Sequence, residues 1–233
     1  MGALPALTSS SGKPIVARLA RADARLLEPH LEAVDLPVRK QLHAPNRRVE
    51  RVYFPDSGIA SVVANHDVPI EVGMVGRDGM TGISVVLGND ERPLHETYMQ
   101  VAGKGQCLAA GRLREAIAKS SALHQVLLRY VQVFLRQTTE TALANGRGKI
   151  EERLARWLLM AHDRIDGDEL KLTHEFLAVM LGVRRAGITS ALQELERKGL
   201  IAHRRSRVTV LDREGLEEGS NGAYSRPTVE RSS

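Results

Sequence analysis

The chain has 233 residues, of which 42% are hydrophobic and only 3% aromatic, and its formal net charge is +5. This length and apolar content suffice for one or two domains with mainly aliphatic cores. The single cysteine, Cys107, excludes an internal disulfide framework, a four-thiolate zinc site and a cysteine-held iron–sulfur cluster.

The sequence contains no run of about 18 or more apolar residues and no long apolar segment after basic residues near its N-terminus. We therefore expect a cytoplasmic protein with no membrane partner. Residues 1–14 and 217–233 are rich in small and polar residues without periodicity, which predicts mobile tails. Leucines recur at helical spacing over residues 15–33 and predict one or two amphipathic helices.

Between Val38 and Cys107, short apolar runs alternate with turn signals such as residues 55–58 and 76–79. Runs over 52–54, 59–64, 70–75 and 99–101 have the length of strands. Short strands at this frequency predict a compact antiparallel β-roll or barrel. Such a roll can hold a small ligand or have a filled core, and the sequence leaves both interpretations open.

A long helix is predicted from about residue 112 to residue 144. Apolar and small residues recur there at alternating spacings of three and four, which is the period of a two-stranded coiled coil. The alternative is a helix lying on its own domain, and we favour a dimer interface. The expected interface residues are Leu127, Val131, Phe134, Thr138 and Thr141.

Residues 145–148 read Asn-Gly-Arg-Gly, and they predict a break after the long helix. Two glycines cost a helix roughly 2 kcal/mol relative to alanine. We therefore expect a hinge over residues 146–148. An apolar stripe beginning at Ile150 predicts another helix beyond it, and a turn at residues 166–168 follows.

Residues 172–210 predict a helix-turn-helix followed by a basic hairpin. Thr173 can cap a short helix, and Gly182 can end it in the left-handed conformation. A second helix from about Arg184 to Lys198 has an apolar stripe and an opposite face with arginine, threonine and serine. These residue types suit base edges and phosphates in the DNA major groove. Residues 171–207 contain eight Lys or Arg against three Asp or Glu, a surplus that favours DNA.

The order of these parts resembles the Crp/Fnr superfamily of bacterial transcription regulators, named after the cyclic-AMP receptor and the fumarate-nitrate regulator. The resemblance covers roughly residues 38–211, and its most specific stretches are residues 52–58, 72–82, 152–160 and 181–185. It implies an α+β chain: a cyclic-nucleotide-binding-like β-roll sensor with N-terminal helices over 15–111, a dimerisation helix over 112–145, a hinge over 146–148 and a winged helix-turn-helix over 149–216. It further implies a homodimer that binds two-fold-symmetric, double-stranded promoter DNA, with RNA polymerase as an additional partner.

Family members read bases near the start of the second helix of the motif. The DNA contacts that the resemblance implies, together with the basic hairpin, are Thr173, Arg184, Arg185, Ala186, Thr189, Ser190, Arg204, Arg205 and Arg207. Arg185 takes the place of a guanine-reading arginine, whereas Ala186 stands where glutamate is frequent. We therefore expect a base preference that differs from the usual half-site.

The residues that correspond to the family's effector pocket are Gly79, Met80, Thr81, Gly82, His95, Glu96 and Thr97. Members that bind cyclic AMP hold the ribose with a Gly-Glu pair and the phosphate with an Arg-Ser pair. Here no glutamate follows Gly79, and residues 94–98 contain Glu96 where the arginine is expected. Because a phosphate would lack its bidentate partner, the usual mode of cyclic AMP binding is not expected, and no cofactor is evident.

Other motifs have simpler interpretations. Cys107 could be a redox sensor, but core packing is favoured. Residues 162–168 could hold a metal, but a solvated acidic loop is favoured, and the glycines of residues 76–82 suit turns better than a phosphate cradle. No nucleophile–base pair predicts an enzyme. The alternative function is a nucleotide-sensing adaptor whose winged helix docks a protein partner.

Overall fold

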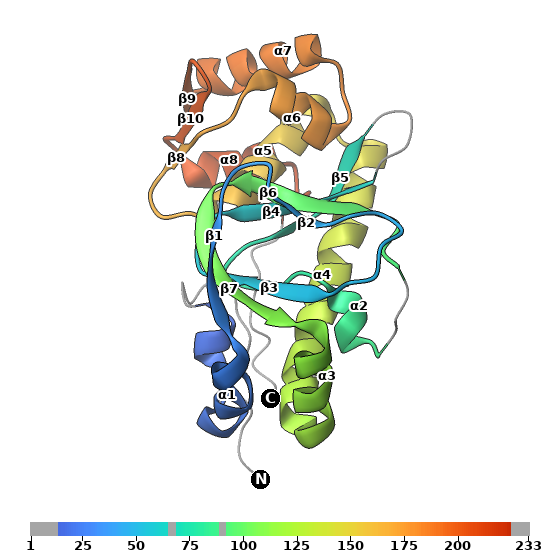
Figure 1. Cartoon of the computed structure of the whole chain (residues 1–233). Coiled ribbons are helices and arrows are strands. Elements are labelled where there is room, and N and C mark those ends of the chain that lie inside the picture. Colours follow the sequence, from blue (N-terminus) through green and yellow to red (C-terminus); the bar gives the residue numbers. More distant parts are fainter. Residues whose placement is uncertain (1–13, 65–68, 89–91, 225–233) are drawn as a thin grey trace. The chain divides into compact units, whose positions relative to one another are not determined.

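A computed structural model describes residues 14–64, 69–88 and 92–224. The chain forms two compact units (Figure 1). The first contains the described residues of 1–62 and 75–136, and the second contains those of 63–74 and 137–226. Among the described helices, none is both long enough and apolar enough to cross a membrane.

The first unit combines short N-terminal helices, an antiparallel β-roll and two longer helices. Its elements begin with η2 (Val16–Arg18), α1 (Arg21–Leu27) and η3 (Glu28–His30). The strands of the roll are β1 (Glu32–Leu36), β2 (Gln41–His43), β3 (Arg51–Pro55), β4 (Ile59–Ala64), β5 (Ile70–Val75), β6 (Glu96–Val101) and β7 (Gly103–Ala109), and all of β5 except Val75 is grouped with the second unit. The helices are α2 (Ile83–Val86), α3 (Ala110–Lys119) and the first part of α4 (Ser121–Arg147). Of these strands, β1, β2 and β7 were not predicted.

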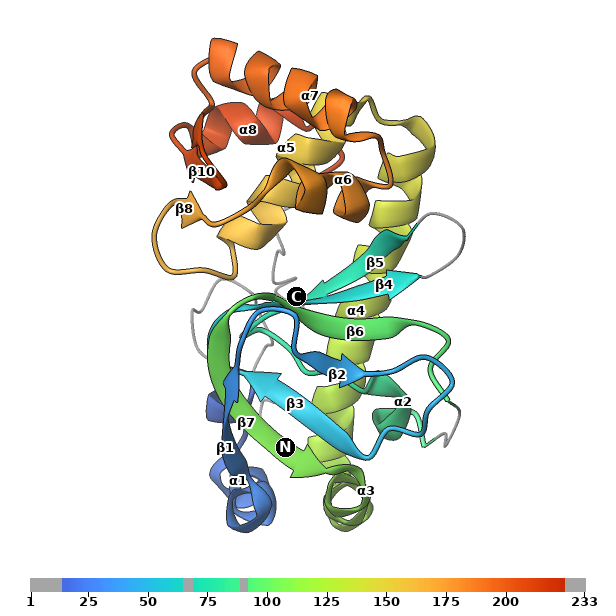
Figure 2. The ribbon, with the colours of Figure 1, turned by 45° about the horizontal axis from the view of Figure 1, so that its top comes forward.

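Two sheets make up the roll, which confirms the predicted fold class. One sheet has the order β1-β7-β3, and Figure 2 shows these strands side by side. Its pairs are antiparallel, and Cys107 of β7 lies opposite Glu32 on one side and Tyr53 on the other. The other sheet has the order β2-β6-β4-β5, and the end of its β4–β5 hairpin belongs to the second unit.

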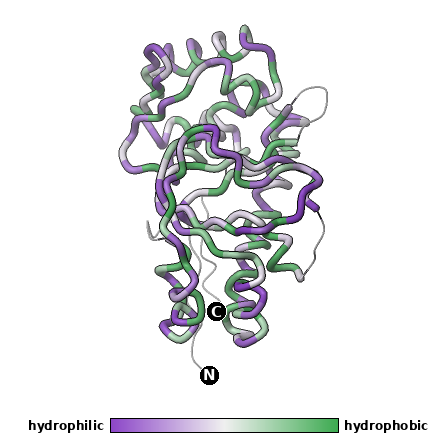
Figure 3. Tube along the Cα trace, in the orientation of Figure 1, coloured by the Kyte–Doolittle hydropathy of each residue, from purple (hydrophilic) through white to green (hydrophobic). Residues whose placement is uncertain are grey.

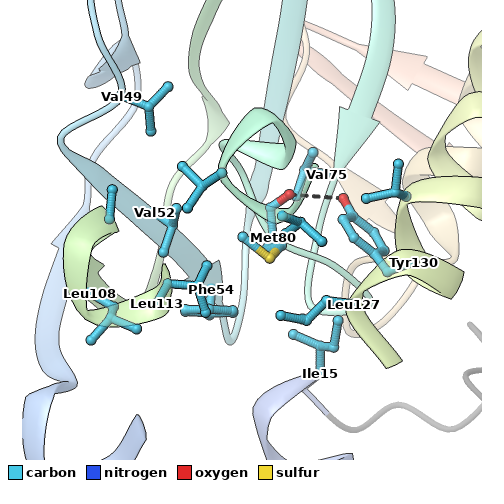
Figure 4. Close-up of a cluster of buried hydrophobic side chains, with 14 of the residues drawn as sticks. Ile15, Val49, Val52, Phe54, Val75, Met80, Leu108, Leu113, Leu127 and Tyr130 are labelled. Carbon is cyan, nitrogen blue, oxygen red and sulfur yellow. Dashed lines mark hydrogen bonds between the residues drawn. The ribbon is translucent and has the colours of Figure 1, made fainter. Parts of the chain in front are cut away.

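The interior of the roll is filled by aliphatic side chains together with Phe54 and Tyr130 (Figure 4). Tyr130 of α4 donates a hydrogen bond from its hydroxyl to the Met80 carbonyl oxygen at 2.9 Å. Its ring lies so close to Gly79 that a Cβ there would be 2.2 Å from Tyr130 Cε2. Glycine at this position therefore allows α4 to approach the roll.

The structure corrects the prediction of one helix over residues 112–144. The chain leaves the helical conformation at Ser120, so that α3 and α4 are separate helices. The Ser120 hydroxyl donates to Asp23 Oδ1 at 2.6 Å and accepts the Leu123 N–H at 3.1 Å, which caps α4. At its other end α4 continues through Gly146 to Arg147, beyond the predicted break, and the Gly148 N–H still bonds the Ala144 carbonyl at 2.8 Å.

The second unit is a small helical domain with a three-stranded sheet. Its elements after α4 are α5 (Ile150–His162), β8 (Glu169–Leu170), α6 (His174–Leu181), α7 (Arg185–Arg197), β9 (Ile201–Arg204), β10 (Arg207–Val210) and α8 (Arg213–Gly219). The sheet has the antiparallel order β8-β10-β9. Hydrophilic and hydrophobic residues alternate along its helices (Figure 3), as amphipathic helices around one core require.

Helix α5 is the centre of this core. It packs against α6, α7 and α8, and Leu154 and Leu158 are fully buried. Trp157 meets the Phe176 ring edge to face at 5.7 Å and donates from Nε1 to Glu71 Oε1 at 2.8 Å. A buried indole N–H thus has a partner, as the low polarity of the surroundings demands.

Residues 217–224, predicted as part of a mobile tail, instead complete α8 and pack on α5. Arg213 donates to Asp163 Oδ1 at 2.7 Å, and the Tyr224 hydroxyl donates to Asp163 Oδ2 at 2.7 Å. His162 lies 2.8 Å from both Arg213 Nη1 and Asp168 Oδ1. The predicted solvated acidic loop is therefore partly tied to α8 by ion pairs. The other predicted tail residues, 1–13 and 225–233, lie outside the described residues.

The contact between Gly79 and Tyr130 predicts a strong effect of a single methyl group. Changing Gly79 to alanine should destabilise the protein by about 1–3 kcal/mol, because a packed ring must move. Urea unfolding measures this loss. Gly111→Ala is the matched control: a Cβ there meets nothing within 4 Å in helix α3, so we expect no loss of stability. Equal stability of the two variants would contradict the proposed packing role.

Candidate nucleic-acid interface

Helices α6 and α7 form the predicted helix-turn-helix. Thr173 caps α6, since its Oγ1 accepts the Phe176 N–H at 3.1 Å. Gly182 ends the helix with φ of +60°, a left-handed conformation that favours glycine. Both predictions are confirmed, and α7 begins at Arg185 after this short turn.

Helix α7 has one buried and one exposed face. Ile188, Ala191, Leu192 and Leu195 are buried. Arg184, Arg185, Ala186 and Ser190 are exposed, and Thr189 is half-buried. The structure thus brings the predicted base-reading residues together at the N-terminal end of one helix, where a recognition helix enters the major groove.

The two hydroxyl side chains on this face bond to their own helix. The Thr189 hydroxyl donates to the Arg185 carbonyl oxygen at 3.2 Å, and the Ser190 hydroxyl donates to that of Ala186 at 3.3 Å. Such bonds to the carbonyl four residues earlier are common for Ser and Thr inside helices. They fix the orientation of both side chains on the exposed face.

His174 is a residue of this surface that sequence reasoning missed. Its Nδ1 lies 3.0 Å from Thr189 Oγ1, within hydrogen-bond distance. Burial, followed by the nearby His203 and Arg185, lowers the pKa of His174. The lowered pKa favours the neutral imidazole at pH 7. Its place one residue after the predicted cap was the only signal in the sequence.

Strands β9 and β10 form the predicted basic hairpin, with Arg204 paired to Arg207 across a turn of two residues. Ser206 adopts φ of +66° in this turn. Arg204 and Arg205 are exposed. Arg207 is also exposed but pairs with Glu169 of β8 at 3.1 Å, so part of its charge is neutralised within the unit. Arg204 and Arg205 are thus the better placed cations of the hairpin.

The predicted effector residues fall in two segments of the first unit. Met80 and Thr81 are buried, and Gly82 has φ of +75° just before α2. Residues 95–97 lie at the start of β6, where Thr97 is buried and pairs with His43 of β2. His43 also bonds the Thr81 hydroxyl at 2.8 Å. The structure therefore brings the two segments together around His43, with their side chains largely packed.

The predicted dimer residues face the interior of their own chain. Leu127, Val131 and Phe134 are only 1%, 3% and 7% exposed and belong to the core of the first unit. Thr138 and Thr141 are half-buried. The first three side chains are unavailable to a partner copy, because they already cover the roll. This arrangement corresponds to the alternative interpretation, a helix lying on its own domain.

Within the described residues, no group of three or more His, Cys, Asp or Glu is arranged to hold a metal ion. Cys107 is 2% exposed, and its Sγ accepts a hydrogen bond from Arg51 Nη1 at 3.1 Å. It is thus a packed residue of β7 with one charged neighbour.

Comparisons with known proteins agree with this geometry. Residues 152–218 match the model of the Crp-like helix-turn-helix domain. No curated protein matches the chain. The fold is similar to that of a protein from Eubacterium rectale described as a regulator of the Crp/Fnr family, with TM-score 0.69, 19% identity, and coverage of 90% of this chain and 99% of that one.

Two further solved structures share the fold. One is TTHB099, a CRP-family transcriptional regulator from Thermus thermophilus, with TM-score 0.66, 21% identity, and coverage of 84% of this chain and 98% of that one. The other is the c-di-GMP-responsive global regulator CLP from Xanthomonas campestris, with TM-score 0.65, 18% identity, and coverage of 82% and 99%. The chain thus has a Crp-like helix-turn-helix domain over residues 152–218, and its fold is similar to that of these regulators.

Proposed function

We propose that this chain is a homodimeric, sequence-specific DNA-binding transcription regulator. The observation that carries the proposal is the N-terminal half of α7, where Arg184, Arg185 and Ser190 are all exposed. Arginine can donate in a fork to guanine, and exposed hydroxyls reach base edges or phosphates. The hairpin cations Arg204 and Arg205 would lie along the phosphate backbone.

The decisive experiment selects bound sites from a randomised DNA pool and then measures affinity at two salt concentrations. We expect a two-fold-symmetric site whose half-sites lie about 34–36 Å apart, and binding that weakens steeply with salt. Arg185→Ala should lose about 1–3 kcal/mol of specific binding and relax the preference at one base pair.

Arg197→Ala serves as the matched control, because Arg197 lies at the other end of α7 and pairs with Glu194 at 2.8 Å. Its affinity should stay close to that of the unchanged protein. If folded Arg185→Ala binds as tightly and as selectively as the control, Arg185 is not a base contact. An absence of DNA binding even at low salt would instead favour the adaptor that docks a protein partner.

The neutral His174 predicts that DNA binding depends on pH. Phosphates favour an imidazolium, so DNA should raise the lowered pKa of His174, and affinity should increase as pH falls below about 6.5. The charged or titratable neighbours are His203, with ring centroids 5.6 Å apart, and Arg185. Fluorescence anisotropy at constant ionic strength should show that His174→Gln loses part of this increase. His30→Gln, an exposed control in the other unit, should retain it, and an unaltered profile in His174→Gln would refute the role.

A second copy of the chain would pack on a stripe of α4 displaced by one residue from the predicted one. This stripe has the same alternating spacing and is exposed at every position: Leu128, Gln132, Leu135, Thr139 and Ala142. Leu128 is 38% and Leu135 is 55% exposed, which is unusual for leucines at the coiled-coil period. The family resemblance, which implies a homodimer, supports this assignment.

Changing Leu135 to arginine should therefore convert the dimer into a monomer, because a charge would be buried at the centre of the interface. Sedimentation or light scattering measures the mass directly. Val133→Arg is the control: Val133 is 42% exposed on the same helix but lies away from the stripe. If both variants keep the mass of the unchanged protein, the dimer does not form through this stripe.

The proposed hinge over residues 146–148 would let a signal in the roll alter the spacing of the two recognition helices. A Cβ on Gly146 would meet nothing within 4 Å, whereas one on Gly148 would lie 2.8 Å from the Ala144 carbonyl oxygen. Gly148 is therefore the position where the joint needs glycine. Immediately after it, Glu152 caps the start of α5, since its Oε2 accepts the Lys149 N–H at 2.9 Å.

A further inference from the structure

A polar cavity of about 320 Å³ lies in the first unit between β2 and β3. Its lining includes Gln41, His43, Arg47, Arg48, Arg51 and Tyr53. None of these residues belongs to the predicted effector segments. Its volume is at the lower end of the range typical of small-molecule sites.

The cavity is electropositive. Three arginines line it against one acidic residue, Glu50, and because Arg51 is also paired with Glu32, a surplus of one positive charge remains. Arg51 is held in place by Glu32, with contacts of 2.7 and 3.3 Å, and by Cys107 Sγ at 3.1 Å. Among the described residues, the Arg47 guanidinium has no hydrogen-bond or ion-pair partner. Such a surplus beside a cavity favours an anionic ligand.

Neutral polar groups also line this cavity. His43 is 7% exposed, and burial lowers its pKa to about 4, so its ring carries no charge at pH 7. His43 meets the Tyr53 ring edge to face at 6.0 Å. The positive charge is therefore confined to the arginines, which can each donate two N–H groups to one phosphate.

Two lining residues, His43 and Tyr53, are connected to helix α4 by a short chain of contacts. His43 Nε2 lies 2.8 Å from Thr81 Oγ1, and this oxygen also accepts the Tyr53 N–H at 3.1 Å. The carbonyl of the preceding residue, Met80, accepts the Tyr130 hydroxyl at 2.9 Å (Figure 4). A ligand that displaces His43 or Tyr53 would thus move Thr81 and the neighbouring Met80. The Met80 carbonyl is the group that binds Tyr130 of α4.

We propose that this cavity binds a small phosphate-bearing ligand, and that the bound ligand alters the packing of α4 on the roll through Thr81, Met80 and Tyr130. A phosphate is attracted by the positive charge of the lining, and its oxygens offer acceptors to several guanidinium groups. Binding of the ligand is independent of the proposed function, whereas its effect on DNA affinity rests on that function.

Calorimetric titration of the full chain, at constant ionic strength, tests the site with inorganic phosphate, pyrophosphate and adenosine monophosphate. We expect saturable binding of at least one probe, with one site per chain. The double variant Arg47→Ala/Arg48→Ala should weaken it by about tenfold or more, since each guanidinium contributes charged hydrogen bonds. Arg25→Ala, an exposed arginine on α1, should leave it unchanged. The site is refuted if no probe binds saturably, or if the double variant binds like the control.

Tyr130→Phe tests the connection, because it removes only the hydroxyl that bonds Met80. We expect the variant to bind the probe as tightly as the unchanged protein while losing the probe's effect on DNA affinity. The connection to α4 is refuted if the probe still changes the DNA affinity of Tyr130→Phe. It is also refuted if a bound probe does not change the DNA affinity of the unchanged protein. Neither result would refute the binding site itself. If the probe binds and no DNA binds under any condition, the proposed function fails and the site stands.

Discussion

The packing of Tyr130 on Gly79 fixes α4 on the first unit. Its ring occupies the space that any Cβ at Gly79 would need, and its hydroxyl satisfies the buried Met80 carbonyl. A buried carbonyl left without its donor costs about 1–3 kcal/mol. This contact determines the rotation of α4 about its own axis, and the rotation decides which apolar stripe covers the roll and which remains exposed.

The helix-turn-helix depends on comparable local constraints at its ends. Thr173 and Gly182 set the beginning and the end of α6, and the buried Ile188 and Leu192 anchor α7 in the core beside α5. The face of α7 that we propose to contact DNA therefore consists of side chains on a helix anchored in the core. In contrast, the hairpin cations stand on a turn, which suits contacts that need charge more than exact position.

Much of this arrangement is readable from sequence, and the failures have physical causes. The cap, the glycine turn and the amphipathic α7 follow from local rules, so they were predicted. The exposed stripe that we propose for the dimer was not, because α4 carries two adjacent stripes of one period, and the more apolar one, with Leu127 and Phe134, covers the roll. Strand β7 was missed because its glycines and Lys104 hide the alternation, and the pairing of Tyr224 with Asp163 is a tertiary contact without a local signal.

The bonds of Thr189 and Ser190 to their own helix limit what this surface can recognise. Both hydroxyl groups lie within hydrogen-bond distance of the backbone carbonyl four residues earlier, and the Ser190 hydroxyl donates to that of Ala186. Ser190 therefore presents lone pairs to its surroundings. Lone pairs suit the amino groups of adenine and cytosine, whereas a phosphate oxygen only accepts and would require the helix bond to break. In the DNA complex that we propose, Ser190 would thus favour a base amino group over a phosphate.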